Sequence, residues 1–335
     1  MIIIKSFALL FVLFFLYKKI FQKLVSKHYN EHQKLAGNES VPLIGGLIFI
    51  SFMIINYKNL GNLIIFFSFL ICLLGILSDI NFLQSPKKRL FFQVFIIFVF
   101  LYFANLNLED LRSEFLNLII SNDFSKHLFL TFCFVILING SNFIDGLNGL
   151  NLGYFLLIFL SLLLLNSKGD IYIEQNKISL LVIPIIFLLI MNFFNYLYLG
   201  DSGAYLIGFL TGIFLVEVNF SNFQISPYFI ALLLWYPAFE NFFSISRKIL
   251  KKFNPALPDT SHLHQLMFKY VKSKKFQLNI YANQISAIII LSFNFIIFLI
   301  SLNYINNTKF LLLLIMINIL VYLITYVLLE KNCKK

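Results

Sequence analysis

The feature that most constrains the fold is a succession of long apolar segments. Hydrophobic residues make up 60% of the 335-residue chain, and charged residues only 12%. Apolar runs of about 15 to 20 residues approach the length that an α-helix needs to cross the hydrocarbon core of a bilayer. Helices can do so because they satisfy their backbone hydrogen bonds internally. The sequence therefore predicts an all-α, polytopic integral membrane protein, with a single transmembrane domain over residues 1–335.

Reading the apolar runs in chain order predicts about eleven transmembrane helices. The predicted spans cover residues 2–17, 43–57, 61–78, 90–104, 127–141, 152–166, 178–195, 203–219, 227–244, 284–303 and 309–329. Several of them are shorter than a full span of roughly 20 residues, so a marginal pair is alternatively one re-entrant element.

The distribution of basic residues predicts the orientation. With eleven spans, 19 of the 26 Lys and Arg residues fall in the loops of one side, including a basic loop at about 246–283. By the positive-inside rule this side is cytoplasmic, which places the N-terminus outside and the C-terminus in the cytoplasm. Topology and contacts with anionic membrane lipids account for the net charge of +11, and no nucleic-acid partner is needed.

Acidic side chains are few and unevenly placed. Of the fifteen, Asp79, Asp145, Asp201, Glu240 and Asp259 fall on or near the predicted cytoplasmic side. Carboxylates at a membrane border are costly without a partner, and Mg²⁺ takes oxygen ligands and often bridges phosphates. The sequence therefore predicts a divalent-cation site, whereas HExxH and CxxC patterns for a transition metal are absent.

The longest polar run between apolar segments extends from Asn139 to Asn151. Asn142, Asp145 and Asn148 are spaced three apart within it, so a helical turn would align them. The Asp-Gly and Asn-Gly pairs also favour turns, so the alternative is a helix break without a ligand.

A glycine-rich turn precedes the eighth predicted span. In Gly200-Asp201-Ser202-Gly203, a helix N-terminus would offer backbone N–H groups to an anion while Asp201 holds a metal. A helix cap without a ligand is the alternative. Further along, Gly208 and Gly212 favour the close approach of a neighbouring helix.

The basic loop contains two histidines, His262 and His264, shortly after Pro258-Asp259. Zinc would require further ligands that are absent, so contact with a phosphate or nucleotide is the preferred interpretation. A solvated loop is the alternative.

Five segments together resemble the polyprenyl-phosphate N-acetylhexosamine-1-phosphate transferases of glycosyltransferase family 4, which are related to phospho-N-acetylmuramoyl-pentapeptide transferase. The matching segments, in order, are Pro42 to Gly46, Gly75 to Asp79 continued to Gln93, Asn139 to Leu150, Gly200 to Ala204, and Pro237 through Glu240 and Arg247 to His264. Three residues depart from the family pattern: Ser78 and Asn148 each stand where an Asp is usual, and Gln265 replaces the last His of His-x-His-His. The His-x-His motif is closer to the branch that uses simple UDP-N-acetylhexosamines, such as UDP-GlcNAc.

The resemblance implies that a polyprenyl phosphate, such as undecaprenyl phosphate, attacks a UDP-N-acetylhexosamine, giving polyprenyl diphosphate-sugar and UMP. The implied catalytic residues are Asp79, Asp145 and Asp201; Mg²⁺, or alternatively Mn²⁺, is expected on Asn142 and Asp201; and the substrate-binding residues are Lys34, Asn139, Asn148, Arg247, His262 and His264. Asp79 is the candidate base or a holder of the lipid phosphate. The expected location is the bacterial inner membrane, with the active site on the cytoplasmic face and a homodimer left open.

Two other functions remain as alternatives. A transporter would place carboxylates near the bilayer midplane, often in repeat-related broken helices, and no repeat is visible here. An inactive family member that acts as a scaffold is suggested by Ser78, Asn148 and Gln265.

Overall fold

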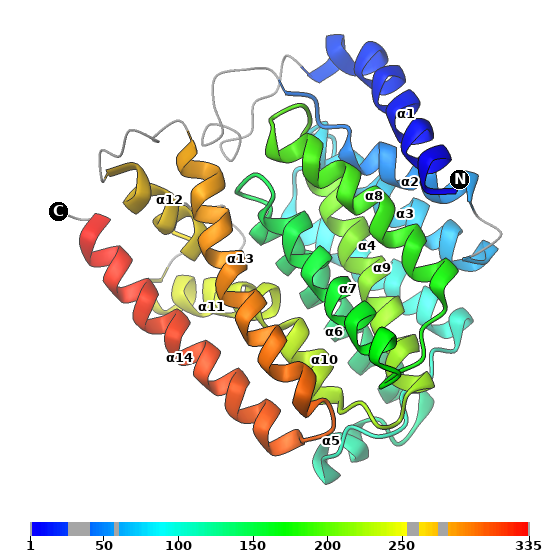
Figure 1. Ribbon diagram of the computed structural model, residues 1–335, viewed down its shortest axis with the longest axis vertical. Helices are drawn as coiled ribbons and strands as arrows, with labels where there is room; N and C mark the ends of the chain where they lie inside the picture. Colours follow the sequence, from blue (N-terminus) through cyan, green and yellow to red (C-terminus); the bar gives the residue numbers. More distant parts are fainter. Residues whose placement is uncertain (1, 26–40, 57–59, 253–260, 274–280, 334–335) are drawn as a thin grey trace.

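The predicted all-α fold is confirmed by the computed structural model, in which the described residues form helices and one isolated β-bridge (Figure 1). The structure describes residues 2–25, 41–56, 60–252, 261–273 and 281–333. Within these ranges the helices are α1 (Ile2–Val25), α2 (Gly45–Ile55), α3 (Asn62–Asp79), α4 (Pro86–Ala104), α5 (Glu114–Ile119), α6 (Asp123–Ile144), α7 (Leu150–Lys168), α8 (Gln175–Phe193), α9 (Gly200–Ser221), α10 (Pro227–Leu233), α11 (Trp235–Leu250), α12 (Leu263–Ser273), α13 (Ala282–Ser301), the 3₁₀ turn η4 (Leu302–Tyr304) and α14 (Thr308–Cys333).

Each of the eleven predicted spans falls on a helix or, for residues 227–244, on the pair α10 and α11. Among the described residues, seven helices are long and apolar enough to cross a membrane, or up to eight if α10 and α11 form one bent span. The helix α2 has only 11 residues, and α4 begins with the charged run Lys87-Lys88-Arg89. These helices support a polytopic membrane protein, whereas the count of eleven spans and the orientation of the termini stay predictions.

The helix α9 lies at the centre of a group formed with α3, α4 and α6, and is buried along most of its length. Gly208 and Gly212 allow α6 to approach, because an added Cβ would lie 3.1 Å from Ile138 Cα and 2.8 Å from Phe134 Cε1, respectively. The prediction of close helix packing at these two glycines is therefore confirmed. On either side of this group, α1 packs against α2 and α8, whereas α14 contacts α10 and α12 at the far side of the bundle (Figure 1).

The chain bends by 69° between α10 and α11. Pro237 lies in the first turn of α11 and has no N–H with which to bond the carbonyl of Leu233, four residues earlier. The hydroxyl of Tyr154 donates to that carbonyl instead, at 2.8 Å. The proline thus explains the break, and α11 runs crosswise beneath α12 (Figure 1).

The turns that the structure describes lie at two ends of the bundle. At one end, here called the carboxylate end, Asp79 contacts the start of α9, and the segment before α2 bonds to Tyr198. At the opposite end, Arg112 donates to the carbonyls of Asn306 at 2.7 Å and Gln224 at 3.1 Å. These contacts mark the two ends of the described bundle, and the predicted assignment of the loops to two sides of a membrane stays a prediction.

Candidate functional site

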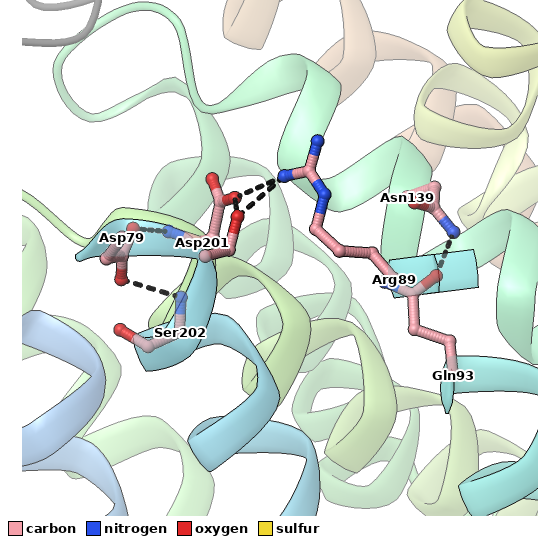
Figure 2. Close-up of polar contacts among 7 residues, drawn as sticks. Asp79, Arg89, Gln93, Asn139, Asp201 and Ser202 are labelled. Atoms are coloured by element: carbon pink, nitrogen blue, oxygen red, sulfur yellow. Dashed lines mark hydrogen bonds and ion pairs between the residues drawn. The ribbon is translucent and has the colours of Figure 1, made fainter. Parts of the chain in front are cut away.

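The carboxylate of Asp79, the last residue of α3, caps the N-terminus of α9. Its Oδ1 accepts a hydrogen bond from the backbone N–H of Asp201 at 2.8 Å, and its Oδ2 accepts one from Ser202 at 3.2 Å (Figure 2). Gly200 begins α9 with a φ of +75°, and an added Cβ there would lie 2.7 Å from Asp79 Oδ2. The expectation that these N–H groups receive an anion from outside is therefore corrected: the anion they bind is Asp79 itself.

The side chain of Asp201 faces away from this cap toward α4. Its Oδ2 accepts a hydrogen bond from Ser78 Oγ at 2.6 Å and forms an ion pair with Arg89 Nη1 at 3.1 Å (Figure 2). Arg89 Nη1 also donates to Ser78 Oγ at 2.6 Å. One carboxylate oxygen of the predicted metal ligand is therefore shared by a hydroxyl and a guanidinium.

Glycines allow α2 and α3 to approach the start of α9 closely enough for these contacts. A Cβ added at Gly75 or at Gly46 would overlap the backbone of Ser202. The N–H of Gly46 also donates to the carbonyl of Leu199 at 3.2 Å. The motif segments at Gly46, Gly75 and Gly200 therefore form one packed unit, although they are far apart in the sequence.

The side chain of Asn139 ties α6 to α4, and its predicted contact with substrate stays untested. Its Nδ2 donates to Gln93 Oε1 at 2.8 Å and to the carbonyl of Val135 at 2.8 Å (Figure 2). Gln93 is fully buried and lies one helical turn after Arg89. Asn139 thus fixes the helix that carries Arg89.

Asn142 and Asp145 lie at the C-terminal end of α6, and both are partly exposed. The pKa of the Asp145 carboxyl is raised well above its usual range, first by loss of solvent and then by the negative charges of Asp201 and Asp79. The three predicted catalytic carboxylates are therefore close enough to interact electrostatically. Such a concentration of negative charge favours a bound cation.

Asn148 is buried and joins the turn after α6 to two other segments. Its Nδ2 donates to Asn195 Oδ1 at 2.5 Å, and its backbone N–H donates to Asn283 Oδ1 at 2.7 Å. The next N–H, that of Gly149, donates to Asn192 Oδ1 at 2.6 Å. These contacts give Asn148 a structural role, and the predicted contact with substrate stays untested.

The two histidines of the basic loop lie beside the turn that carries Asp145. His262 Nδ1 pairs with Glu240 Oε1 at 2.9 Å, and its ring stacks on that of His264 with centroids 5.6 Å apart. A Cβ added at Gly146 would overlap the ring of His264. The start of α12 is therefore packed against the central polar run.

Arg247 follows Glu240 by about two helical turns in α11. Its Nη1 donates to Tyr326 OH at 3.2 Å, its Nη2 donates to Ser244 Oγ at 3.5 Å, and only 8% of the residue is exposed. These described contacts do not bring Arg247 to Asp79 or Asp201. Lys34 and Asp259 lie outside the described residues.

Oxygen atoms suited to a hard divalent cation are available at the carboxylate end. Asp145, Asp201 and Asn142 supply carboxylate and amide oxygens, which Mg²⁺ prefers, although Arg89 engages one oxygen of Asp201. In the described ranges, no group of three or more His, Cys, Asp and Glu side chains forms a ready-made metal cluster. The residues fit a cation held by few protein ligands and completed by water or phosphate.

Sequence reasoning included Arg89 only as part of a motif and assigned no partner to Glu240. The signal for Arg89 is its position four residues before the buried Gln93, which places both on the inward face of α4. Glu240 also accepts a hydrogen bond from Tyr322 at 2.9 Å, a contact with α14 that no local pattern predicts.

Comparisons with known proteins match a part of the chain that includes three of the five segments. The model of glycosyl transferase family 4 matches residues 62–219, from the start of α3 almost to the end of α9. A probable undecaprenyl-phosphate N-acetylglucosaminyl 1-phosphate transferase of Bacillus subtilis is 24% identical over 211 residues, which cover 61% of this chain and 57% of the relative. A phospho-N-acetylmuramoyl-pentapeptide-transferase of Prochlorococcus marinus is 27% identical over 288 residues, covering 75% of this chain and 76% of the relative.

Proposed function

We propose that this chain, a member of glycosyl transferase family 4, transfers the sugar-1-phosphate of a UDP-N-acetylhexosamine to a polyprenyl phosphate, releasing UMP. The observation that carries the proposal is that the family match covers α3 to α9, the helices whose ends bring Asp79, Asp145 and Asp201 together. We place the site on the cytoplasmic face of a bacterial inner membrane, where the product would begin a cell-envelope glycan.

The site composition suits a transfer between two anions. Catalysis of phosphoryl transfer depends mainly on positioning and on stabilising charge. Mg²⁺, when bound by Asp201 and Asn142, would supply positive charge to the diphosphate of the donor. Asp145 would orient this cation or the lipid phosphate, and His264, packed against Gly146, is placed to contact the nucleotide part.

Asp79 is better suited to holding the site together than to moving a proton. Both of its oxygens accept backbone N–H groups of α9, so it fixes the position of Asp201. A phosphate monoester loses its second proton near pH 6, by analogy with phosphorylated side chains, so the acceptor needs no base at neutral pH. The lipid phosphate would then attack as the dianion.

The three departures from the family pattern each have a polar partner in the fold. Ser78 donates to Asp201, and Asn148 donates to Asn195. Gln265 Oε1 accepts the backbone N–H of His262 at 3.1 Å, as a residue of a capping box does at a helix start. An intact set of contacts favours an active transferase over a scaffold, and carboxylates gathered at one end favour it over a transporter.

The test is UMP release by membranes that contain the protein, undecaprenyl phosphate, Mg²⁺ and a panel of UDP-N-acetylhexosamine donors. We expect UMP from at least one donor, loss of the activity with EDTA, and loss with Asp201→Asn. The matched control is Asp123→Asn, the same change at an exposed position of the opposite end. Absence of UMP from every donor, with lipid and metal saturating, would contradict the proposal.

A further inference from the structure

We propose that Arg89 breaks its ion pair with Asp201 in order to bind the phosphate of the lipid acceptor. This exchange couples binding of the lipid to binding of the cation. The inference rests on the proposed function and deepens it by assigning the lipid phosphate to a residue.

The ion pair between Arg89 and Asp201 is of a kind that a ligand can exchange. It uses one guanidinium nitrogen, Nη1, which also bonds Ser78 Oγ, rather than the two parallel bonds of a bidentate pair (Figure 2). Both side chains retain about a quarter of their exposure, at 25% and 24%. Solvent therefore screens the pair, and such pairs contribute little to stability.

The position of Arg89 in α4 suits a lipid that carries a phosphate. Arg89 ends an inward-facing stripe that continues through the buried Gln93, whereas the neighbouring residues Leu90 and Phe91 are 47% and 65% exposed. An apolar chain can lie along the exposed face of α4 while its phosphate reaches the guanidinium within one helical turn. Arginine suits this contact, because its planar guanidinium matches phosphate oxygens.

The surrounding charges make Arg89 necessary for an anionic acceptor. Asp79, Asp145 and Asp201 would repel a phosphate, and Arg89 is the cation that pairs with this group among the residues whose ion pairs the structure describes. When Arg89 turns to the lipid phosphate, Asp201 Oδ2 loses its counter-ion and becomes a better ligand for a divalent cation. By linkage, the cation then favours lipid binding by the same factor.

The decisive variant is Arg89→Gln, tested on the purified full chain by separate binding measurements. We expect it to weaken binding of farnesyl phosphate, a short polyprenyl phosphate, by about tenfold. We expect it to strengthen Mn²⁺ binding, followed by electron paramagnetic resonance, by about fivefold, because a competing charge is gone. Binding of UMP stays unchanged, and farnesyl phosphate no longer tightens Mn²⁺ binding as it does in the parent chain.

Lys88→Gln is the matched control, because it removes the same charge from the adjacent, exposed position of α4 and leaves all three affinities unchanged. Arg89→Lys keeps the charge and retains most of the farnesyl phosphate affinity. General damage to the fold would weaken all ligands together, so an increase for Mn²⁺ with a decrease for the lipid is specific.

An Arg89→Gln variant that binds farnesyl phosphate normally, or binds Mn²⁺ no more tightly, overturns the inference. If Arg89→Gln fails in this way while Asp201→Asn abolishes Mn²⁺ binding, only the role of Arg89 is overturned and the metal assignment stands. If the parent chain binds no Mn²⁺, or if Asp201→Asn leaves its binding intact, the metal assignment in the proposed function falls as well.

Discussion

The hydroxyl of Ser78 occupies a place where the resembling family usually has a carboxylate, and its contacts show what this changes. Ser78 Oγ donates to Asp201 and accepts from Arg89, so it bridges an acid and a base without adding charge. A carboxylate there could not donate to Asp201, and the two negative charges would repel unless a cation lay between them. The serine therefore lets Arg89 balance this part of the site.

We predict that Ser78→Asp lowers the Mg²⁺ concentration needed for half-maximal UMP release by about fivefold, since the added charge increases the attraction for a cation. Ser78→Asn is the control, because it changes the size of the side chain similarly but adds no charge. An equal shift in both variants, or a higher Mg²⁺ requirement for Ser78→Asp, would show that charge at this position does not govern metal binding.

The convergence of Asp79, Asp145 and Asp201 could be predicted from the sequence, because each ends or begins an apolar span on the same predicted side. Their individual partners could not. Asp79 and Asp201 are adjacent only because Gly75 and Gly200 allow two helices to meet there. Such close approaches of helices decide whether a side chain is free to bind a ligand or is hydrogen-bonded within the protein. They leave no periodic pattern in the sequence.

At the scale of elements, one buried carboxylate links the start of α12 to α11 and α14, in addition to the packing of α12 against α13 and α14. Glu240 of α11 pairs with His262, accepts from Tyr322 of α14, and receives the backbone N–H of Leu263 at 3.4 Å. Because Glu240 is only 1% exposed, removing its charge leaves these donors without their ionised partner in a region poor in water. The position of both histidines thus depends on Glu240, which lies 22 residues before His262 within the same matching segment.

We predict that Glu240→Gln destabilises the protein by about 2 to 3 kcal/mol and lowers its melting temperature in detergent. The control is Glu330→Gln, which alters the exposed pair Lys251–Glu330 between α11 and α14, at 3.2 Å, and costs less than about 1 kcal/mol. Equal melting temperatures for the two variants would mean that the buried network does not hold α12 in place.

Helix positions followed from the apolar runs, because a helix buried in lipid or protein must be apolar over most of its length. The ends were less predictable. The helix α4 begins at Pro86, four residues before its apolar run, since Ser85 caps it and proline suits a first turn. The bend before α11 depends on a tertiary partner, because the hydroxyl of Tyr154 donates to the carbonyl of Leu233 that Pro237 leaves without a helical donor. Polar helix starts and bends therefore require knowledge of neighbouring elements.

At the scale of the whole molecule, basic residues and the carboxylates of the candidate site lie at the same end of the described bundle. Lys87, Lys88 and Arg89 begin α4 beside Asp201, and the start of α12 packs against Gly146, whereas the opposite end is tied by Arg112 to backbone carbonyls. Basic loops are retained in the cytoplasm, which is also where nucleotide-sugars are made available to a membrane enzyme. The distribution of charge therefore supports the proposal that the site faces the cytoplasm, where its proposed donor is found.

This orientation predicts which exposed positions a membrane-impermeant maleimide reaches in right-side-out spheroplasts. In a chain whose Cys72, Cys133 and Cys333 are replaced by serine, Asp170→Cys at the opposite end should react at once. Lys88→Cys at the carboxylate end should react only after the membrane is permeabilised. Because both positions are exposed to solvent or head groups in the fold, a difference in labelling reports the side of the membrane rather than burial. Labelling of Lys88→Cys in sealed spheroplasts would place the carboxylates outside and remove the cytoplasmic donor from their reach.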